Sequence, residues 1–151
     1  MSNIPALITC AEKLKEGYVL CVGDVMLDRF VYGDVERISP EAPIPVFRIL
    51  TENVMLGGAG NVARNISGLG GRTRFVSVVG NDQAGRDVTT QVGKISDLDA
   101  RLITDTSRNT SIKTRYIASG QQMMRVDDET VASLDGTTRK SLLDAATLGM
   151  E

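Results

Sequence analysis

Residues 57–63 read Gly57-Gly58-Ala59-Gly60-Asn61-Val62-Ala63. From residue 59 onward, apolar side chains recur with helical spacing, at Ala59, Val62, Ala63, Ile66 and Leu69. Gly70 and Gly71 follow, and glycines are typical of the end of a helix. The stretch therefore predicts a helix that begins directly after a pair of glycines.

Short apolar runs flank this helix on both sides. Residues 18–23 precede it and residues 74–80 follow it, and both are typical of buried strands. A second helix is predicted over residues 84–94, with Asp82 as its cap in a strand-to-helix turn. The chain thus runs from a strand through an intervening segment, residues 24–56, to a helix, a second strand and a second helix. This order predicts an α/β fold with a parallel sheet.

Further strands are predicted in the intervening segment and after residue 94. A proline-rich segment, residues 37–45, cannot lie in a central strand, and we expect it outside the core. The predicted strands cover residues 29–33, 44–50, 100–104, 112–118 and 123–127, with a hairpin turn at 119–122. A last helix is expected from about residue 135 to the end, residue 151. We therefore predict one domain with an inserted sheet.

Composition excludes several classes of function. The net charge is -2 and aromatic residues make up 4%, which disfavours nucleic-acid binding. Histidine is absent, so His-based triads and His zinc sites are excluded. Cys10 and Cys21 lack metal or redox spacing. The sequence has no apolar run of membrane-spanning length and no leader pattern. We therefore expect no association with a membrane and a cytoplasmic location.

Two segments carry the candidate sugar site. Asp28 follows the first strand, where a carboxylate can accept hydrogen bonds from sugar hydroxyls. Gly57 and Gly58 let a ligand approach the backbone at a helix start, and Asn61 adds a side chain that donates and accepts. The alternatives are turn caps for Asp28 and tight turns for the glycines.

Three cations lie on the last two predicted strands. Lys113 and Arg115 share a face by the period of two, and Arg125 is on the neighbouring strand. They could hold a phosphate group on a substrate, or form a solvated basic face. We find no metal-ligand spacing in the sequence.

Together these segments resemble the PfkB/ribokinase family of carbohydrate kinases. The likeness rests on Gly57-Gly58-Ala59-Gly60-Asn61-Val62-Ala63 followed by Gly70 and Gly80, and on the turn at residues 80–85. Residues 23–30, 37–46 and 121–127 resemble motifs of the heptose 7-phosphate kinases within that family. The resemblance implies a ribokinase-like three-layer sandwich with a small β-sheet lid, formed by segments of about 29–50 and 111–127.

The resemblance also implies roles for residues. Asp28 binds sugar hydroxyls, while Gly57, Gly58 and Asn61 line the sugar pocket, and the lid pairs two subunits into a dimer. The implied reaction uses ATP and Mg²⁺ to phosphorylate D-glycero-D-manno-heptose 7-phosphate at its anomeric hydroxyl.

The chain departs from the family in one respect. The family's catalytic base lies in a Gly-Ala-Gly-Asp motif that does not occur here. We therefore expect residues 1–151 to be the N-terminal part of the kinase domain, without the ATP-binding half, inactive alone and without bound cofactor. The alternatives are a non-catalytic sugar-phosphate-binding or dimerisation module, and a kinase for another sugar.

Overall fold

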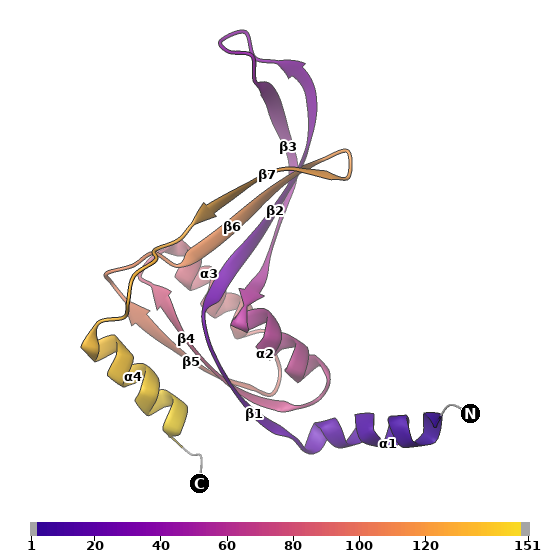
Figure 1. Cartoon of the computed structure of the whole chain (residues 1–151), viewed down its shortest axis with the longest axis vertical. Coiled ribbons are helices and arrows are strands. Elements are labelled where there is room, and N and C mark those ends of the chain that lie inside the picture. The colour runs from indigo at the N-terminus through magenta and orange to yellow at the C-terminus, as the bar shows by residue number, and fades with distance from the viewer. Residues whose placement is uncertain (1–2, 149–151) are drawn as a thin grey trace.

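A computed structural model describes residues 3–148 of the chain (Figure 1). Its helices are α1 (Ile4–Lys13), η1 (Leu14–Glu16), α2 (Ala59–Gly68), α3 (Gln83–Val92) and α4 (Gly136–Thr147). Its strands are β1 (Tyr18–Val22), β2 (Val25–Ile38), β3 (Pro45–Gly58), β4 (Arg72–Gly80), β5 (Leu98–Asp105), β6 (Ser111–Ala118) and β7 (Gln121–Asp128). The predicted last helix is α4, and the end of that prediction lies outside the described residues.

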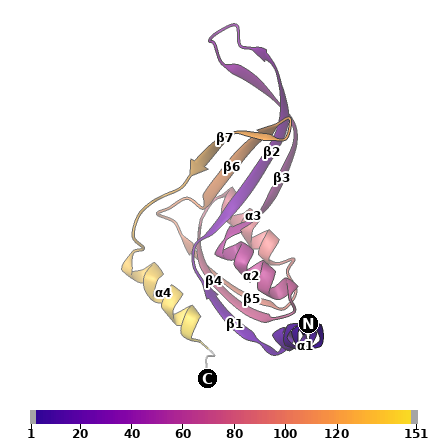
Figure 2. The ribbon, with the colours of Figure 1, turned by 45° about the vertical axis from the view of Figure 1, so that its right-hand side comes forward.

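The first sheet is parallel, with strand order β1-β4-β5. Helices α2 and α3 lie on one face of this sheet and α4 lies on the other (Figures 1 and 2). The predicted α/β arrangement of three layers is therefore confirmed. It forms because β4 is an apolar strand whose two faces are both buried, so that it needs cover from both sides.

The main core lies between the first sheet and helices α2 and α3. Phe75 and Val79 of β4 point into it and meet Ala63 of α2 and Val88 of α3. Leu27, from the lower end of β2, also packs here and is fully buried. The core thus anchors one end of the second sheet to the first.

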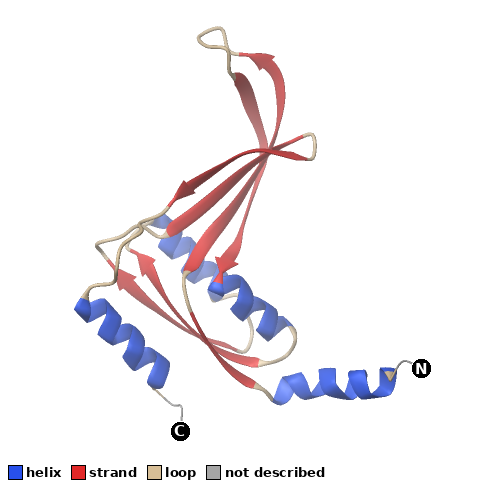
Figure 3. Cartoon of the chain, in the orientation of Figure 1, coloured by secondary structure: helices blue, strands red, loops and turns tan. Residues whose placement is uncertain are grey.

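The second sheet has strand order β3-β2-β6-β7 and extends away from the helices (Figure 3). Strands β2 and β6 are parallel, whereas the two outer pairs are antiparallel. The β2–β3 hairpin continues beyond β6, whose pairing with β2 stops at Gly33. Pro40 and Pro43 lie at its exposed tip, outside the core as predicted. We call this four-stranded sheet the lid.

The predicted strands 29–33 and 44–50 were too short. Strands β2 and β3 each contain 14 residues, and Asp28 lies inside β2 rather than in a turn. Strand β2 begins only three positions after β1 ends. The buried Ser77 of β4 stabilises this short link between the two strands, which we call the β1–β2 crossing. Its hydroxyl donates to the Gly23 carbonyl at 2.7 Å and accepts from the Val25 amide at 3.0 Å.

Two predicted turns have the expected backbone. Helix α2 is followed by Gly70, whose φ is +87°, and the Gly70 and Gly71 amides donate to carbonyls of the last helical turn. Ser119 and Gly120 join β6 to β7 with φ values of +51° and +76°. Positive φ at both central residues is typical of a two-residue hairpin turn.

Asp82 caps α3, as predicted, and also ties that helix to the start of the lid. Its Oδ1 accepts from the Gly85 amide at 2.7 Å, and its Oδ2 accepts from the Thr110 amide at 2.7 Å. Partial burial disfavours its charged form. The hydrogen bonds from Thr110 and Gly85 outweigh that effect and hold the pKa of Asp82 below its usual value.

This lowered pKa predicts a pH effect on stability. A carboxyl whose pKa is lower in the folded state stabilises the fold above its unfolded pKa of about 3.9, and the contribution is lost as pH falls further. We expect the melting temperature to fall between about pH 4 and pH 2, and to fall less steeply in Asp82→Asn. Scanning calorimetry across this range measures both slopes. Equal slopes would contradict this role for Asp82.

Apolar side chains are exposed at the outer edge of the first sheet. Within residues 3–148, β1 pairs only with β4, and Tyr18, Val19 and Val22 remain exposed. Helix α1 also exposes its apolar residues, including Leu7 and Ile8. Exposed apolar surfaces of this kind favour self-association. No helix in the described part of the chain has the length and apolar character needed to cross a membrane.

Candidate sugar-binding site

Asp28 and Arg115 meet at the base of the lid. Asp28 lies in β2 and pairs in register with Lys113 of β6. Arg115 lies two residues after Lys113 on β6, so the side chains of Asp28, Lys113 and Arg115 share one face of the sheet. The Arg115 guanidinium donates from Nη1 to Oδ1 of Asp28 at 2.6 Å. Both side chains are largely buried, with exposed fractions of 18% for Asp28 and 22% for Arg115. The predicted sharing of a face by Lys113 and Arg115 is consistent with this register.

Lys113 is held by two carboxylates. Its Nζ donates to Asp127 at 2.9 Å and to Glu129 at 3.2 Å. These hydrogen bonds, that to Asp127 first, raise the pKa of Lys113. The hydrogen bond from Lys113, followed by that from Arg125, lowers the pKa of Asp127. The positive charges on this face are therefore balanced by neighbouring carboxylates, and the face is not a purely basic patch.

Gly57 and Gly58 bring the end of β3 close to β2. A Cβ atom on Gly57 would lie 2.5 Å from Oδ2 of Asp28, so only glycine leaves room for this carboxylate. Gly58 has φ +56°, and its Cβ would lie 2.5 Å from the Asp24 carbonyl oxygen. That carbonyl accepts from the Ala59 amide at 2.9 Å. The glycine pair thus sets the start of α2 against the β1–β2 crossing.

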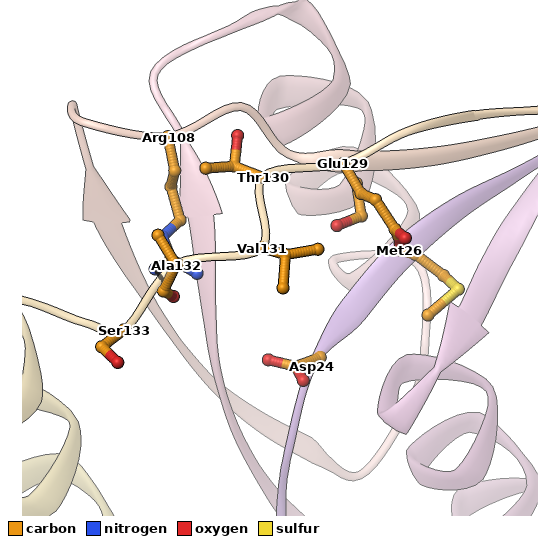
Figure 4. A pocket seen from close by; sticks show the side chains of 9 residues that line it. Asp24, Met26, Arg108, Glu129, Thr130, Val131, Ala132 and Ser133 are labelled. Atoms are coloured by element: carbon orange, nitrogen blue, oxygen red, sulfur yellow. Dashed lines mark hydrogen bonds between the residues drawn. The ribbon is translucent and has the colours of Figure 1, made fainter.

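A cavity of about 490 Å³ adjoins this face (Figure 4). Met26 and Ser111 contribute from β2 and β6, two residues before Asp28 and Lys113 and therefore on the same face of the lid. Asp24 lies opposite the segment that follows β7, which supplies Glu129. The remaining lining residues are Arg108, Thr130, Val131, Ala132 and Ser133. Two carboxylates and several hydroxyls on an open cavity suit a polyol.

Arg108 fixes the wall of this cavity. It donates to the buried Asp105 at 3.1 Å and to the Ala132 carbonyl at 2.9 Å. Hydrogen bonds from Ser107, followed by that from Arg108, lower the pKa of Asp105. The segment after β7 is therefore attached to the end of β5, where open α/β sheets bind ligands.

The structure brings only part of the predicted set together. Asp28, Gly57, Lys113 and Arg115 lie at one place, with Gly58 next to them on the Asp24 side. Asn61 lies in the first turn of α2, where its Oδ1 accepts from Arg64 at 2.9 Å. Arg125 is on the outer strand, with 53% of its side chain exposed, and contacts Asp127.

None of the nine residues that line the cavity belongs to the set predicted from the sequence. Asp24 and Glu129 supply its two carboxylates. Ser111 and Arg108 had no sequence signal at all. The position of Asp24 directly after a buried strand was the one usable signal.

Comparison with known proteins identifies the family. The family model described as pfkB family carbohydrate kinase matches residues 16–148. The chain belongs to this family. The pfkB match covers both sheets and all the candidate site residues, so the predicted resemblance is confirmed.

Curated relatives of this pfkB chain share one name. The Bifunctional protein HldE of Paramagnetospirillum magneticum is 53% identical over 143 residues, which is 95% of this chain and 29% of that protein. The Bifunctional protein HldE of Rhodospirillum rubrum is 54% identical over 135 residues, 89% of this chain and 27% of that protein. The pfkB chain therefore spans less than a third of the length of these relatives.

Solved structures agree on the fold. A putative sugar kinase from Clostridium perfringens matches with a TM-score of 0.59 and 21% identity, over 84% of this chain and 40% of that chain. At this level of identity the likeness shows the fold alone. The ribokinase-like architecture predicted for this pfkB chain is confirmed.

Proposed function

We propose that the protein carrying this chain phosphorylates D-glycero-D-manno-heptose 7-phosphate at its anomeric hydroxyl, as a step toward ADP-heptose for the lipopolysaccharide core. Residues 1–151 supply the sugar-binding part and the lid of its kinase domain. The observation that carries this proposal is the 53% identity to an HldE protein across nearly the whole chain. The motifs that resemble heptose 7-phosphate kinases support the same substrate.

The geometry at the lid base supports sugar binding. Oδ1 of Asp28 is engaged by Arg115, and Oδ2 is directed toward Gly57. An oriented carboxylate is a strong acceptor for sugar hydroxyls. The adjoining cavity supplies Asp24 and Glu129 for hydroxyls at the other end of a long sugar chain. Gly57, Gly58 and Asn61 complete the pocket wall in this proposal.

The substrate phosphate requires cations on the lid. Arg125 is the most exposed of the predicted three, and among residues 3–148 its one carboxylate partner is Asp127, so it suits this role best. Lys113 would exchange Asp127 or Glu129 for phosphate oxygens. Arg115, predicted for the same role, has Asp28 as its carboxylate partner in the free chain.

The lid also supports a homodimer. Within residues 3–148 the outer edge of β7 has no partner strand, and Met123, Met124 and Val126 are exposed along it. Pairing two lids would cover these side chains.

ATP would supply the phosphoryl group with Mg²⁺ as its counterion, in the cytoplasm where ATP is available. The described residues contain no group of three or more acidic, cysteine or histidine side chains that could hold a metal. No magnesium ligand is proposed among residues 3–148. Their proposed task is to bind and orient the sugar and to exclude water beneath the lid.

A coupled assay on the complete gene product tests this function. We expect the formation of ADP from ATP to depend on heptose 7-phosphate, with fructose 6-phosphate and ribose as comparison sugars. Stimulation by a comparison sugar alone would replace the substrate but keep the kinase. No stimulation by any sugar, from folded protein, would contradict the proposal.

A further inference from the structure

Arg115 and Asp28 form the one ion pair among residues 3–148 that joins β6 to β2. The two residues are 87 positions apart, and Arg115 lies opposite Phe30 in the register, two residues along β2 from Asp28. The guanidinium therefore reaches back along the strand to the carboxylate. This diagonal contact holds the two central strands of the lid together at the site.

The guanidinium is itself held in place. Its central carbon lies 5.1 Å from the centroid of the Phe30 ring, within the range of a cation–π contact. Nη1 also lies 3.4 Å from the Lys113 carbonyl oxygen. With both charged side chains about four-fifths buried, this pair differs from mobile surface ion pairs.

The contact leaves one carboxylate oxygen of Asp28 for a ligand. Among the described residues, no hydrogen bond to Oδ2 accompanies the 2.6 Å bond to Oδ1. Oδ2 is directed toward Gly57, where a Cβ would lie 2.5 Å away. Arg115 and Gly57 together thus determine the orientation of the free oxygen.

The same contact weakens the case for Arg115 as a phosphate ligand. Its positive charge is balanced by Asp28 at hydrogen-bond distance, so the pair as a unit is neutral. A phosphate bound there would have to displace the carboxylate and leave it partly buried without its partner, which is costly.

We propose that Arg115 is a positioning residue that orients the Asp28 carboxylate toward the sugar, and that it contributes to binding through the sugar rather than through the phosphate. This inference rests on the proposed function and adds a specific role to it. Phe30 and Gly57 take part by holding the guanidinium and by leaving room for Oδ2.

Calorimetric titration of the complete gene product with heptose 7-phosphate and with the phosphate-free heptose separates the two roles. Arg115→Gln should weaken binding of both sugars by a similar factor, about tenfold, because one charge-assisted hydrogen bond to Asp28 is lost. In an Asp28→Asn background, the same substitution should cost no more than about twofold further. Phe30→Leu should weaken binding of both sugars by about threefold. This variant tests the same role if Arg115→Gln does not fold.

Arg101→Gln is the matched control, since Arg101 pairs with Asp99 at 2.9 Å on the distant β5 and should leave both affinities unchanged. If Arg115→Gln or Phe30→Leu weakens only the phosphorylated sugar, or if the Arg115 effect adds in full to Asp28→Asn, the positioning role is wrong. Failure of the unsubstituted protein to bind either sugar would instead contradict the proposed function. That outcome is measured without any variant, so it is distinct from failure of the positioning role.

Discussion

Replacing Asp28 with alanine is expected to lower the affinity for heptose 7-phosphate by at least about 100-fold. The variant removes the acceptor for sugar hydroxyls, and two charge-assisted hydrogen bonds are worth about 3 kcal/mol or more together. It also leaves the Arg115 guanidinium partly buried without its carboxylate, which would then attract the substrate phosphate into a wrong position. Calorimetric titration of the complete gene product measures the loss.

Asp34→Ala provides the matched control for this prediction. Asp34 lies on the same strand, β2, but beyond the end of β6, where it pairs with the exposed Arg48 at 3.2 Å. We expect its affinity to stay within about twofold of the unsubstituted protein, since exposed ion pairs contribute little. Equal losses in the two variants would show that the lid, and not the Asp28 carboxylate, is responsible.

Replacing Phe75 with alanine is expected to lower the free energy of unfolding by about 3–5 kcal/mol. Phe75 is the largest fully buried side chain of β4, at 0% exposure, and it packs in the core that also contains Leu27 of the lid. The loss combines the transfer of apolar surface with the cavity that remains in a close-packed interior. Urea unfolding followed by circular dichroism measures it.

Phe47→Ala is the corresponding change outside this core. Phe47 packs edge-on against Tyr116 of the lid, with ring centroids 5.3 Å apart, and is only partly buried. We expect a loss of about 1–2 kcal/mol, mainly from this aromatic pair and its limited burial. A cost for Phe75→Ala no greater than that for Phe47→Ala would mean that the first sheet does not supply the dominant core.

The sequence alone predicted helices α2, α3 and α4 and the three strands of the first sheet. Helix α2 carries apolar side chains at helical spacing, and β4 is a short apolar run. Gly70 marks a helix end with a positive φ that other residues rarely adopt. The Asp82 cap follows from a local hydrogen bond within three residues. Such features depend on near neighbours in the chain, so they can be predicted from spacing.

Strand length in the lid depended on tertiary structure. Strand β3 extends to Gly58, although residues 51–55 are exposed and show no apolar alternation. Its residues are in a strand because β2 offers a full row of backbone partners, and no local pattern records that. The predicted strands therefore stopped too early, and the first of them began at residue 29, directly after Asp28.

The candidate site was predicted in part for the same reason. Asp28, Gly57, Lys113 and Arg115 could be named from residue type and motif. That Arg115 binds Asp28, that Lys113 is neutralised by Asp127 and Glu129, and that Asp24 faces the segment after β7 were decided by folding. These contacts join residues many positions apart through the parallel pairing of β2 with β6. Sequence spacing carries no information about which charges such a pairing brings into contact, and only the tertiary structure determines them.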